Sequence, residues 1–358
     1  MKTPLYDKHK ELKARIVDFH GWMMPIQYTS IIEEHNNVRK NAGIFDLSHM
    51  GRVEIEGKDR NSYLQKLLTV DIEKIENGRA KYCFFLNENG GVLDDLIVYQ
   101  DDKKAFLVIN ASNRIKILKW MENHRNNFEI SITDKTQKTA LIAIQGPHSE
   151  KVMRDVFDLN LSRIKYYRFT TAKIEGLDTM VARTGYTGED GFEIFIDAQK
   201  AANVWDRLSK AGVNPTGLGA RDTLRTEAGM ALYGQEIDEE INPLEAGLLF
   251  AISLEKPDYI GKKALEKIKG SGISRKLAGF SSSKKRIPRN GMEIYDSNGE
   301  NTIGYVTSGT FSPTLSKPIA MGYVGADFAG IGKKVLINMR GEKEEFEIIK
   351  LPFYSRKA

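Results

Sequence analysis

The chain has 358 residues, of which 41% are hydrophobic and 28% charged, with a formal net charge of +5. This length exceeds what one ordinary hydrophobic core organises, so we expect two or three domains, and the composition is that of a globular protein. The small, dispersed positive excess argues against nucleic acid as a partner and favours anionic small molecules or an acidic protein.

Several other classes are excluded by what the sequence lacks. Cys83 is the sole cysteine, so no internal disulfide and no CxxC redox or metal site is expected. The six histidines show no metal-ligand spacing, which predicts no metal site. The start, Met1 to Asp7, has no signal or transit character, and no apolar run approaches the ~20 residues of a membrane span. These observations predict a cytoplasmic protein without a membrane segment.

The first half of the chain mixes helices and strands. Ser30 and Glu33 form a capping-box pattern that predicts a helix over 30–43, ended by Gly43. Further helices are expected at 59–68 and 112–126. Asn89-Gly90 is typical of a hairpin turn, and strands are predicted at 52–55, 82–86, 92–99 and 106–109. Adjacent hairpins imply mostly antiparallel sheets.

The second half changes character near residue 275. Before that point, two apolar runs, 179–182 and 192–196, flank a glycine-rich loop and predict a hairpin with an elaborated turn. The charged segment 262–275 is interpreted as a linker. Beyond it, short β-type runs alternate with Gly, Asn and Asp turns, which predicts a small all-β barrel or jelly roll.

Glu193 is the first candidate for a functional side chain. Alternation puts Glu193 and Phe195 on one face of their strand and Phe192 and Ile194 on the other. A carboxylate beside an aromatic ring suits a flat heteroaromatic ligand, such as a pterin or guanine, that presents an N–H edge. The alternative is a charged residue at a strand edge.

Asp95 is the second candidate. Alternation in the strand 92–99 groups Asp95 with Leu93, Ile97 and Tyr99, and turns Asp94 to the opposite face. Desolvation among apolar neighbours raises a carboxylate pKa, as proton handling or stabilisation of a developing cation requires. The alternative is an Asp near a turn whose oxygens accept backbone N–H groups, a role for which Asp94 is the better candidate.

Arg221 lies on a predicted helix, 219–229, on a face shared with Leu224, Arg225 and Ala228. An inward Arg needs a carboxylate or carbonyl partner. It either forms an internal salt bridge with Asp222, Glu227 or Glu236, or borders a ligand beside Glu193. The Gly217-Leu218-Gly219 sequence lacks the third glycine and the preceding strand of a dinucleotide fingerprint, so no nucleotide cofactor is expected.

Six sequence blocks occur in the order of one known family. They resemble those of the T-protein family of the glycine cleavage system, the tetrahydrofolate-dependent aminomethyltransferases. The blocks are Asp18-Phe19-His20-Gly21-Trp22, Asp46-Leu47-Ser48-His49-Met50-Gly51, Gly90-Gly91-Val92-Leu93-Asp94-Asp95, Arg183 to Ile194, Gly217-Leu218-Gly219-Ala220-Arg221-Asp222 and Thr307-Ser308-Gly309.

The resemblance implies an α+β fold of three domains arranged as a clover leaf around a central folate site. Two are mixed helix and antiparallel-sheet domains and the third is a β-barrel or jelly roll. The implied boundaries are 1–50 with 138–270 for a discontinuous folate-binding domain, 51–137 for an inserted domain and 275–358 for the barrel.

The resemblance also assigns site residues. It makes Asp95 the catalytic carboxylate, because it matches the second Asp of the family's Gly-Gly-x-x-Asp-Asp block. Glu193 and Arg221 match folate-binding positions, and Tyr354 is expected to close the site. The weaker pocket candidates are Met50, Tyr99, Asn110 and Tyr186.

The implied activity is transfer of the methylene of an aminomethyl group, carried on the lipoyl arm of H-protein, to tetrahydrofolate with release of ammonia. Tetrahydrofolate is then a co-substrate, H-protein the partner, and the enzyme is expected to be a monomer.

Related folate-binding proteins provide the competing interpretations. The demethylase half of sarcosine and dimethylglycine enzymes normally sits beside a flavin domain, for which this chain has neither fingerprint nor room. An accessory factor for iron–sulfur or tRNA modification is the main alternative, but it carries a cysteine where this chain reads Ala231 to Glu236. A non-enzymatic basic adaptor is the third.

Overall fold

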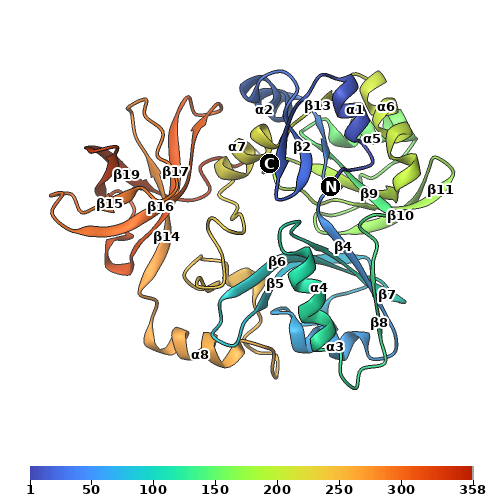
Figure 1. Ribbon diagram of the computed structural model, residues 1–358, viewed down its shortest axis with the longest axis horizontal. Coiled ribbons are helices and arrows are strands. Elements are labelled where there is room, and N and C mark those ends of the chain that lie inside the picture. The colour runs from blue at the N-terminus through green and yellow to red at the C-terminus, as the bar shows by residue number, and fades with distance from the viewer. Residues whose placement is uncertain (357–358) are drawn as a thin grey trace. The chain divides into compact units, whose positions relative to one another are not determined.

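The computed structural model describes residues 1–356 and divides into two compact units (Figure 1). The first unit comprises Met1–Phe84 and Asp94–Arg221, and the second comprises Phe85–Leu93 and the chain from Asp222 onward. Each unit is described by itself. The chain crosses from one unit to the other inside regular elements, so neither unit is a single continuous stretch of sequence.

Within the described residues, the first unit contains a six-stranded sheet in the order β10-β11-β12-β9-β3-β13. Neighbouring strands are antiparallel except for the parallel pair β13 and β3. The strands are β3 (Gly43–Asp46), β9 (Thr139–Gln145), β10 (Phe169–Ile174), β11 (Leu177–Ala182), β12 (Gly191–Asp197) and β13 (Asn214–Pro215).

A second sheet has the order β5-β6-β7-β4-β8, and a small hairpin joins β1 to β2. The antiparallel pairing agrees with the hairpins expected from the sequence. The strands are β1 (Arg15–Phe19), β2 (Trp22–Gln27), β4 (Gly51–Glu56), β5 (Arg79–Leu86), β6 (Val92–Gln100), β7 (Lys104–Ile109) and β8 (Ser131–Asp134).

The helices of the chain are short. They are α1 (Tyr6–Glu11), α2 (Ile31–Lys40), α3 (Arg60–Leu67), α4 (Arg114–Asn123), α5 (Ser149–Phe157), α6 (Ala201–Lys210), α7 (Leu218–Glu227) and α8 (Lys262–Ser271).

The helix α2 begins as predicted but ends earlier. The Ser30 side chain accepts from the backbone N–H of Glu33, which confirms the N-terminal cap. The predicted end at Gly43 is wrong, because Asn41 is the C-cap residue and Gly43 opens strand β3. Ile32 of this helix is exposed, and Glu34, His35 and Val38 form its buried side.

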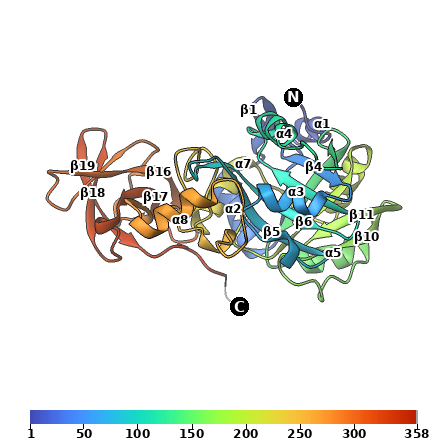
Figure 2. The ribbon, with the colours of Figure 1, turned by 90° about the horizontal axis from the view of Figure 1, so that it is seen from below.

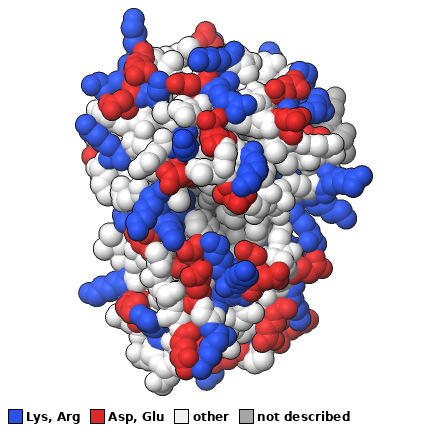
Figure 3. All heavy atoms as spheres, turned by 90° about the vertical axis from the view of Figure 1, so that its right-hand side faces the viewer, with Lys and Arg blue, Asp and Glu red and all other residues white. Residues whose placement is uncertain are grey.

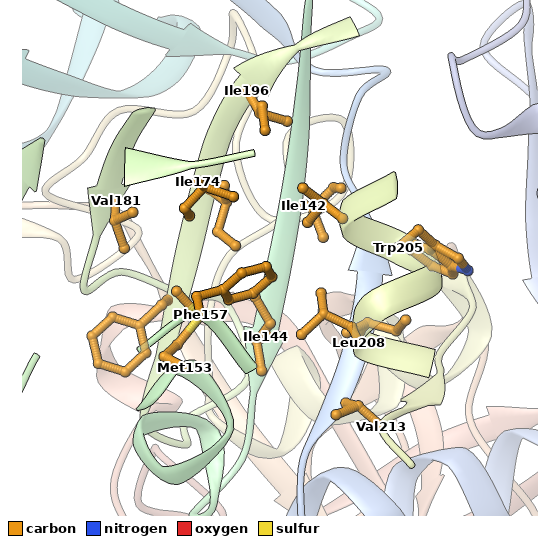
Figure 4. Close-up of a cluster of buried hydrophobic side chains, with 14 of the residues drawn as sticks. Ile142, Ile144, Met153, Phe157, Ile174, Val181, Ile196, Trp205, Leu208 and Val213 are labelled. Atoms are coloured by element: carbon orange, nitrogen blue, oxygen red, sulfur yellow. The ribbon is translucent and has the colours of Figure 1, made fainter. Parts of the chain in front are cut away.

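One face of the six-stranded sheet packs against α5 and α6 (Figure 4). Ile142 and Ile144 of β9 and Ile194 of β12 are fully buried there with Trp205 of α6. The alternation predicted for 192–195 is therefore confirmed, because Phe192 and Ile194 belong to this core. It fixes the direction of Glu193, which projects from the opposite face of the same strand.

The opposite face of β12 meets the second sheet through aromatic rings. Phe195 of β12 contacts Tyr99 of β6 at 5.3 Å and Phe106 of β7 at 5.4 Å between ring centroids. These edge-to-face contacts are the preferred geometry of aromatic pairs. Glu193 thus lies on the aromatic-rich face between the two sheets of the first unit.

The second unit contains the closed barrel that the sequence predicts. Its strand order is β14-β17-β16-β15-β18-β19, with antiparallel pairing. The strands are β14 (Arg275–Ser281), β15 (Glu293–Tyr295), β16 (Thr302–Ser312), β17 (Lys317–Gly325), β18 (Lys334–Met339) and β19 (Glu342–Ile349). Apolar side chains that include Phe280, Val306 and Phe346 fill the barrel. The α+β class with a C-terminal barrel is confirmed.

The segment 262–275 differs from the predicted linker. Residues Lys262–Ser271 form α8, which precedes the barrel (Figure 2). The buried Leu265 anchors this helix, and Gly272 lies at its end. The clover-leaf arrangement and the three domain boundaries stay predictions.

No helix within residues 1–356 is long and apolar enough to cross a membrane.

The core under α5 and α6 gives a stability prediction. We expect Ile142→Ala to lower the free energy of unfolding by ~2–5 kcal/mol, because it leaves a cavity in a fully buried cluster. Ile32→Ala is the matched control and should cost no more than ~0.5 kcal/mol, since that side chain is 52% exposed. Guanidinium unfolding followed by circular dichroism measures both. Equal effects of the two variants would contradict the packing described.

Candidate active site

The loop between β11 and β12 wraps around the side chain of Gln145. The amide of Gln145 donates to the carbonyl oxygen of Thr184 at 3.0 Å and accepts from the hydroxyl of Thr187 at 3.0 Å. A Cβ at Gly185 would lie 2.0 Å from Oε1 of this amide, and a Cβ at Gly191 would lie 2.2 Å from its Nε2. Two glycines of the loop are therefore required by the close approach of one buried amide.

The remaining glycine and two of the three acids have structural roles. Gly188 has a φ of +79°, a conformation that suits glycine. Asp190 pairs with Arg183 through two hydrogen bonds of 2.9 and 2.6 Å, which holds the two ends of the loop together. Glu189 pairs with Arg39 of α2 at 2.9 Å.

Glu193 is the acid of this motif without an arginine or lysine bonded to it. Its Oε2 accepts from the hydroxyls of Thr184 at 2.5 Å and Tyr99 at 3.2 Å. Within the described chain, Oε1 accepts no hydrogen bond. Burial raises the pKa of Glu193, and the hydrogen bonds and the positive charge of Arg221 oppose that rise. The carboxylate therefore has one oxygen fixed by the protein and one available to a ligand donor.

Arg221 lies in the first turn of α7, with its guanidinium 4.7 Å from the centre of the Tyr186 ring. Among residues 1–356 no carboxylate forms an ion pair with it. The internal salt bridge considered from the sequence is instead made by Arg225, which pairs with Asp222 at 2.8 Å and Glu236 at 2.7 Å. Burial lowers the pKa of Arg221. The pKa of an arginine is nevertheless so far above neutral pH that the guanidinium stays charged. A cation held in this way is a candidate to bind an anionic group or a carbonyl oxygen of a ligand.

Asp95 is held by two neutral side chains. Its Oδ2 accepts from the hydroxyl of Tyr82 at 2.9 Å, and its Oδ1 accepts from Nδ2 of Asn110 at 2.7 Å. Burial raises the pKa of Asp95, and these two hydrogen bonds oppose the rise. Side chains from β5 and from the residue after β7 therefore bond Asp95 in addition to a backbone N–H.

The predicted separation of Asp94 from Asp95 is only partly correct. Asp94 is fully buried and structural, as expected. The same Nδ2 of Asn110 nevertheless donates to Asp94 at 2.8 Å as well as to Asp95. The two carboxyl groups therefore meet on one amide, because Asn110 stands at the strand end where both side chains can reach it.

The weaker candidates divide into two groups. Tyr99, Asn110 and Tyr186 contact Glu193, Asp95 and Arg221 respectively, as given above. Met50 follows β3, is partly exposed, and its carbonyl oxygen accepts from Arg52 at 2.5 Å. Tyr354 lies in the second unit, where its backbone N–H donates to the carbonyl oxygen of Glu227 at 2.8 Å.

His49 precedes Met50 and is not a base. Burial, and next the charge of Arg221, lower the pKa of His49 to about 3, so it is neutral near pH 7. Its ring packs against Phe19.

Sequence reasoning missed three polar side chains near the candidates: Tyr82, Thr184 and Asn113. The sequence predicts Tyr82 only as part of the strand 82–86. Because that strand is predicted to lie beside 92–99, the hydroxyl of Tyr82 could have been expected to face Asp95. Asn113 donates to Asp94 at 2.7 Å. No sequence pattern indicates that contact, because it depends on how α4 follows β7.

No group of three or more His, Cys, Asp or Glu side chains that could hold a metal ion occurs within residues 1–356.

Comparison with known proteins agrees with the sequence resemblance. The family model described as the GCVT N-terminal domain matches residues 5–256, and the glycine cleavage T-protein C-terminal barrel domain matches residues 275–355. The chain is 46% identical to an aminomethyltransferase of Halothermothrix orenii over 98% of this chain and 99% of that protein. It is 44% identical to an aminomethyltransferase of Desulfitobacterium hafniense over 100% and 99%.

A solved structure is also similar. The crystal structure of the glycine cleavage system aminomethyltransferase T from Bartonella henselae superposes with a TM-score of 0.94 at 34% identity, covering 99% of this chain and 98% of that one.

The packing of Gln145 against the loop gives a second prediction. We expect Gly185→Ala to destabilise the protein by about 2 kcal/mol, because the new Cβ displaces a buried amide from two hydrogen bonds. In a Gln145→Ala background the same change should cost much less, since the amide is gone. Thermal unfolding of the native protein, the two single variants and the double variant measures this double-mutant cycle. Gly270→Ala in α8, where nothing lies within 4 Å of the new Cβ, should be neutral or slightly stabilising. Additive effects of the two loop changes would refute this packing argument.

Proposed function

The chain belongs to the glycine cleavage T-protein family of aminomethyltransferases, and we propose that it moves the methylene of an aminomethyl group on lipoylated H-protein to tetrahydrofolate. The carbon–sulfur bond to the lipoyl arm and the carbon–nitrogen bond to the amino group break. The products are methylene-tetrahydrofolate, ammonia and the dithiol form of the carrier.

The observation that carries this proposal is the state of Glu193. It is a buried carboxylate with one oxygen held by two hydroxyls and the other without a protein donor. The pterin ring presents adjacent N–H and NH2 donors, which a carboxylate accepts well. The aromatic rings on the same sheet face supply apolar contact for a flat ring. The residues present therefore fit a reduced folate.

Arg221 and Tyr186 are the second part of this candidate site. The guanidinium forms no ion pair with a carboxylate among the described residues, and the Tyr186 ring lies beside it. We assign it to polar acceptors of the folate, with Tyr99, Met50 and Asn110 as neighbours. Tyr354 is proposed as a folate-binding residue from the family resemblance alone. When bound, tetrahydrofolate supplies the nucleophilic nitrogen that receives the methylene.

Asp95 is assigned the catalytic role. Its side chain is oriented by Tyr82 and Asn110, neither of which carries a charge that would neutralise it. A carboxylate held in this way stabilises positive charge that develops on the transferred carbon, or handles the proton of the leaving ammonia. Its raised pKa favours the second of these as well, since it brings the group closer to the working pH.

The partner proposed is an acidic carrier, which the net charge of +5 favours. Basic and acidic side chains are interspersed on the face that Figure 3 shows, so this attraction is expected to be diffuse. We further propose that the protein is a cytoplasmic monomer that meets H-protein transiently. The accessory-factor alternative requires folate binding without turnover.

The test of the reaction is ammonia release in a single turnover with aminomethylated H-protein. We expect release that depends on tetrahydrofolate, and Asp95→Asn should slow it by about 10²-fold or more, the scale of a lost acid–base or electrostatic contribution. Folate affinity should change little. Folate binding without release would favour the accessory-factor interpretation, and native turnover in the variant would remove Asp95 from the mechanism.

Glu193→Ala should act on binding. We expect the dissociation constant for tetrahydrofolate to rise by roughly one to two orders of magnitude, because ligand donors lose a buried acceptor at a cost of ~1–3 kcal/mol. Since burial raises the pKa of Glu193, affinity should also fall as the pH drops through that pKa, and this dependence should vanish in Glu193→Gln. Calorimetric titration measures both. Unchanged affinity in Glu193→Ala would place the folate elsewhere.

A further inference from the structure

Asp94 accepts three N–H groups although it is fully buried. Its Oδ2 accepts from the backbone N–H of Asn110 at 3.1 Å. Its Oδ1 accepts from Nδ2 of Asn110 at 2.8 Å and from Nδ2 of Asn113 at 2.7 Å. A buried carboxylate is stable only when its oxygens are paired in this way. Two of the three bonds go to one residue.

That residue, Asn110, is also the donor to Asp95. Its Nδ2 lies 2.8 Å from Oδ1 of Asp94 and 2.7 Å from Oδ1 of Asp95. The two ends of a side-chain amide differ in chemistry, because the NH2 end donates hydrogen bonds and the oxygen end accepts them. Asp95 gains a hydrogen bond only while the NH2 end points between the two carboxyl groups.

Asp94 and the backbone carbonyl oxygen of Asp95, which accepts from the same Nδ2 at 3.1 Å, together determine which end of the amide points there. Both Asp94 oxygens face N–H donors, and the backbone N–H of Asn110 cannot turn away. An amide in place of Asp94 would keep its oxygen on that backbone N–H and present its own NH2 group to the side chain of Asn110. Asn110 relieves this contact between two donors by turning its amide, which withdraws the NH2 donor from the Asp95 carboxyl group.

The other titratable groups that face Asp95 are phenols that do not change charge near pH 7. Within the first unit these are Tyr82 of β5, which donates to it, and Tyr167, which precedes β10. Burial raises the pKa of both phenols, so both stay neutral near pH 7. Burial, and next the charge of Asp95, raise the pKa of Asp94, so its negative charge is partly lost near neutral pH.

We propose that Asp94 is a positioning residue that acts through Asn110, holding its amide so that Nδ2 donates to Asp95. The proposal rests on the role of Asp95 given above. Asp94 itself has no assigned contact with a substrate.

The test is the titration of Asp95 in variants of the protein. It is measured from the pH dependence of the carboxyl 13C chemical shift and from the acid limb of the pH–turnover profile. In Asp94→Asn we expect the Asp95 titration to move to higher pH by about one pH unit, because the ionised form loses a hydrogen-bond donor. Turnover should fall about tenfold with the KM for tetrahydrofolate unchanged. If Asp94 acted only through its charge, the Asp95 titration would move to lower pH. The sign of the shift therefore distinguishes positioning through Asn110 from an effect of the Asp94 charge.

Two further variants isolate the path through Asn110. In Asn110→Ala we expect a similar upward shift, and adding Asp94→Asn to it should produce no further upward shift. Asn113→Ala removes a donor to Asp94 without touching Asp95, and should leave the Asp95 titration near its native position.

The outcomes that would overturn the proposal are specific. They are an unchanged or downward titration of Asp95 in Asp94→Asn, or a further upward shift when Asp94→Asn is added to Asn110→Ala. If Asp94→Asn does not fold, an unmoved titration in Asn110→Ala overturns it equally. Because the 13C readout needs no turnover, a protein that lacks folate-dependent ammonia release would contradict the proposed function while this test still stands.

Discussion

Asp94, Asp95 and Glu193 lie in the first unit without a bonded cation, and the candidate site depends on how these carboxyl groups are stabilised. Asp94, Asp95 and Glu193 accept only from hydroxyl and N–H donors. Neutral donors stabilise a carboxylate without cancelling its charge, whereas an ion pair with arginine lowers its pKa and uses its oxygens. The charge of Asp95 and Glu193 in their ionised forms is therefore not cancelled by a bonded cation.

Other acids close to Glu193 in the sequence differ from it because they are paired with arginine. Glu189 and Asp190 lie within a few residues of Glu193, yet Arg39 and Arg183 hold them. The same contrast separates Arg225, which has two carboxylate partners, from Arg221 one helical turn earlier. In each case one residue has an ion-pair partner, and its neighbour along the chain has none among the described residues.

The scaffold beneath these charges is a rigid one. Glu193 projects from a strand whose other face is buried under α5 and α6, so its direction is set by the core. The turn that precedes it is fixed by the amide of Gln145 and by the pair of Arg183 and Asp190. A site built on paired strands holds its geometry better than one on a free loop.

The sequence by itself determined the local structure and most of the candidate residues. Alternation in 192–195 gave the direction of Glu193, Asn89-Gly90 gave a turn, and the regular short strands after residue 275 gave the barrel. These are short-range properties, because side-chain periodicity and turn preference depend on neighbouring residues. The resemblance to a family added roles for Asp95, Arg221 and Tyr354 that no periodicity could supply.

The tertiary structure alone decided which charged groups are paired. Glu189 finds Arg39 across 150 positions of sequence, and Arg52 is held by Ser48 and by Thr136 and Thr139 from a distant segment. It also decided that one amide, Asn110, serves both Asp94 and Asp95, which alternation had placed on opposite faces. Hydrogen-bond partners depend on where separate elements pack in space, and a pattern along the chain carries no record of that distance.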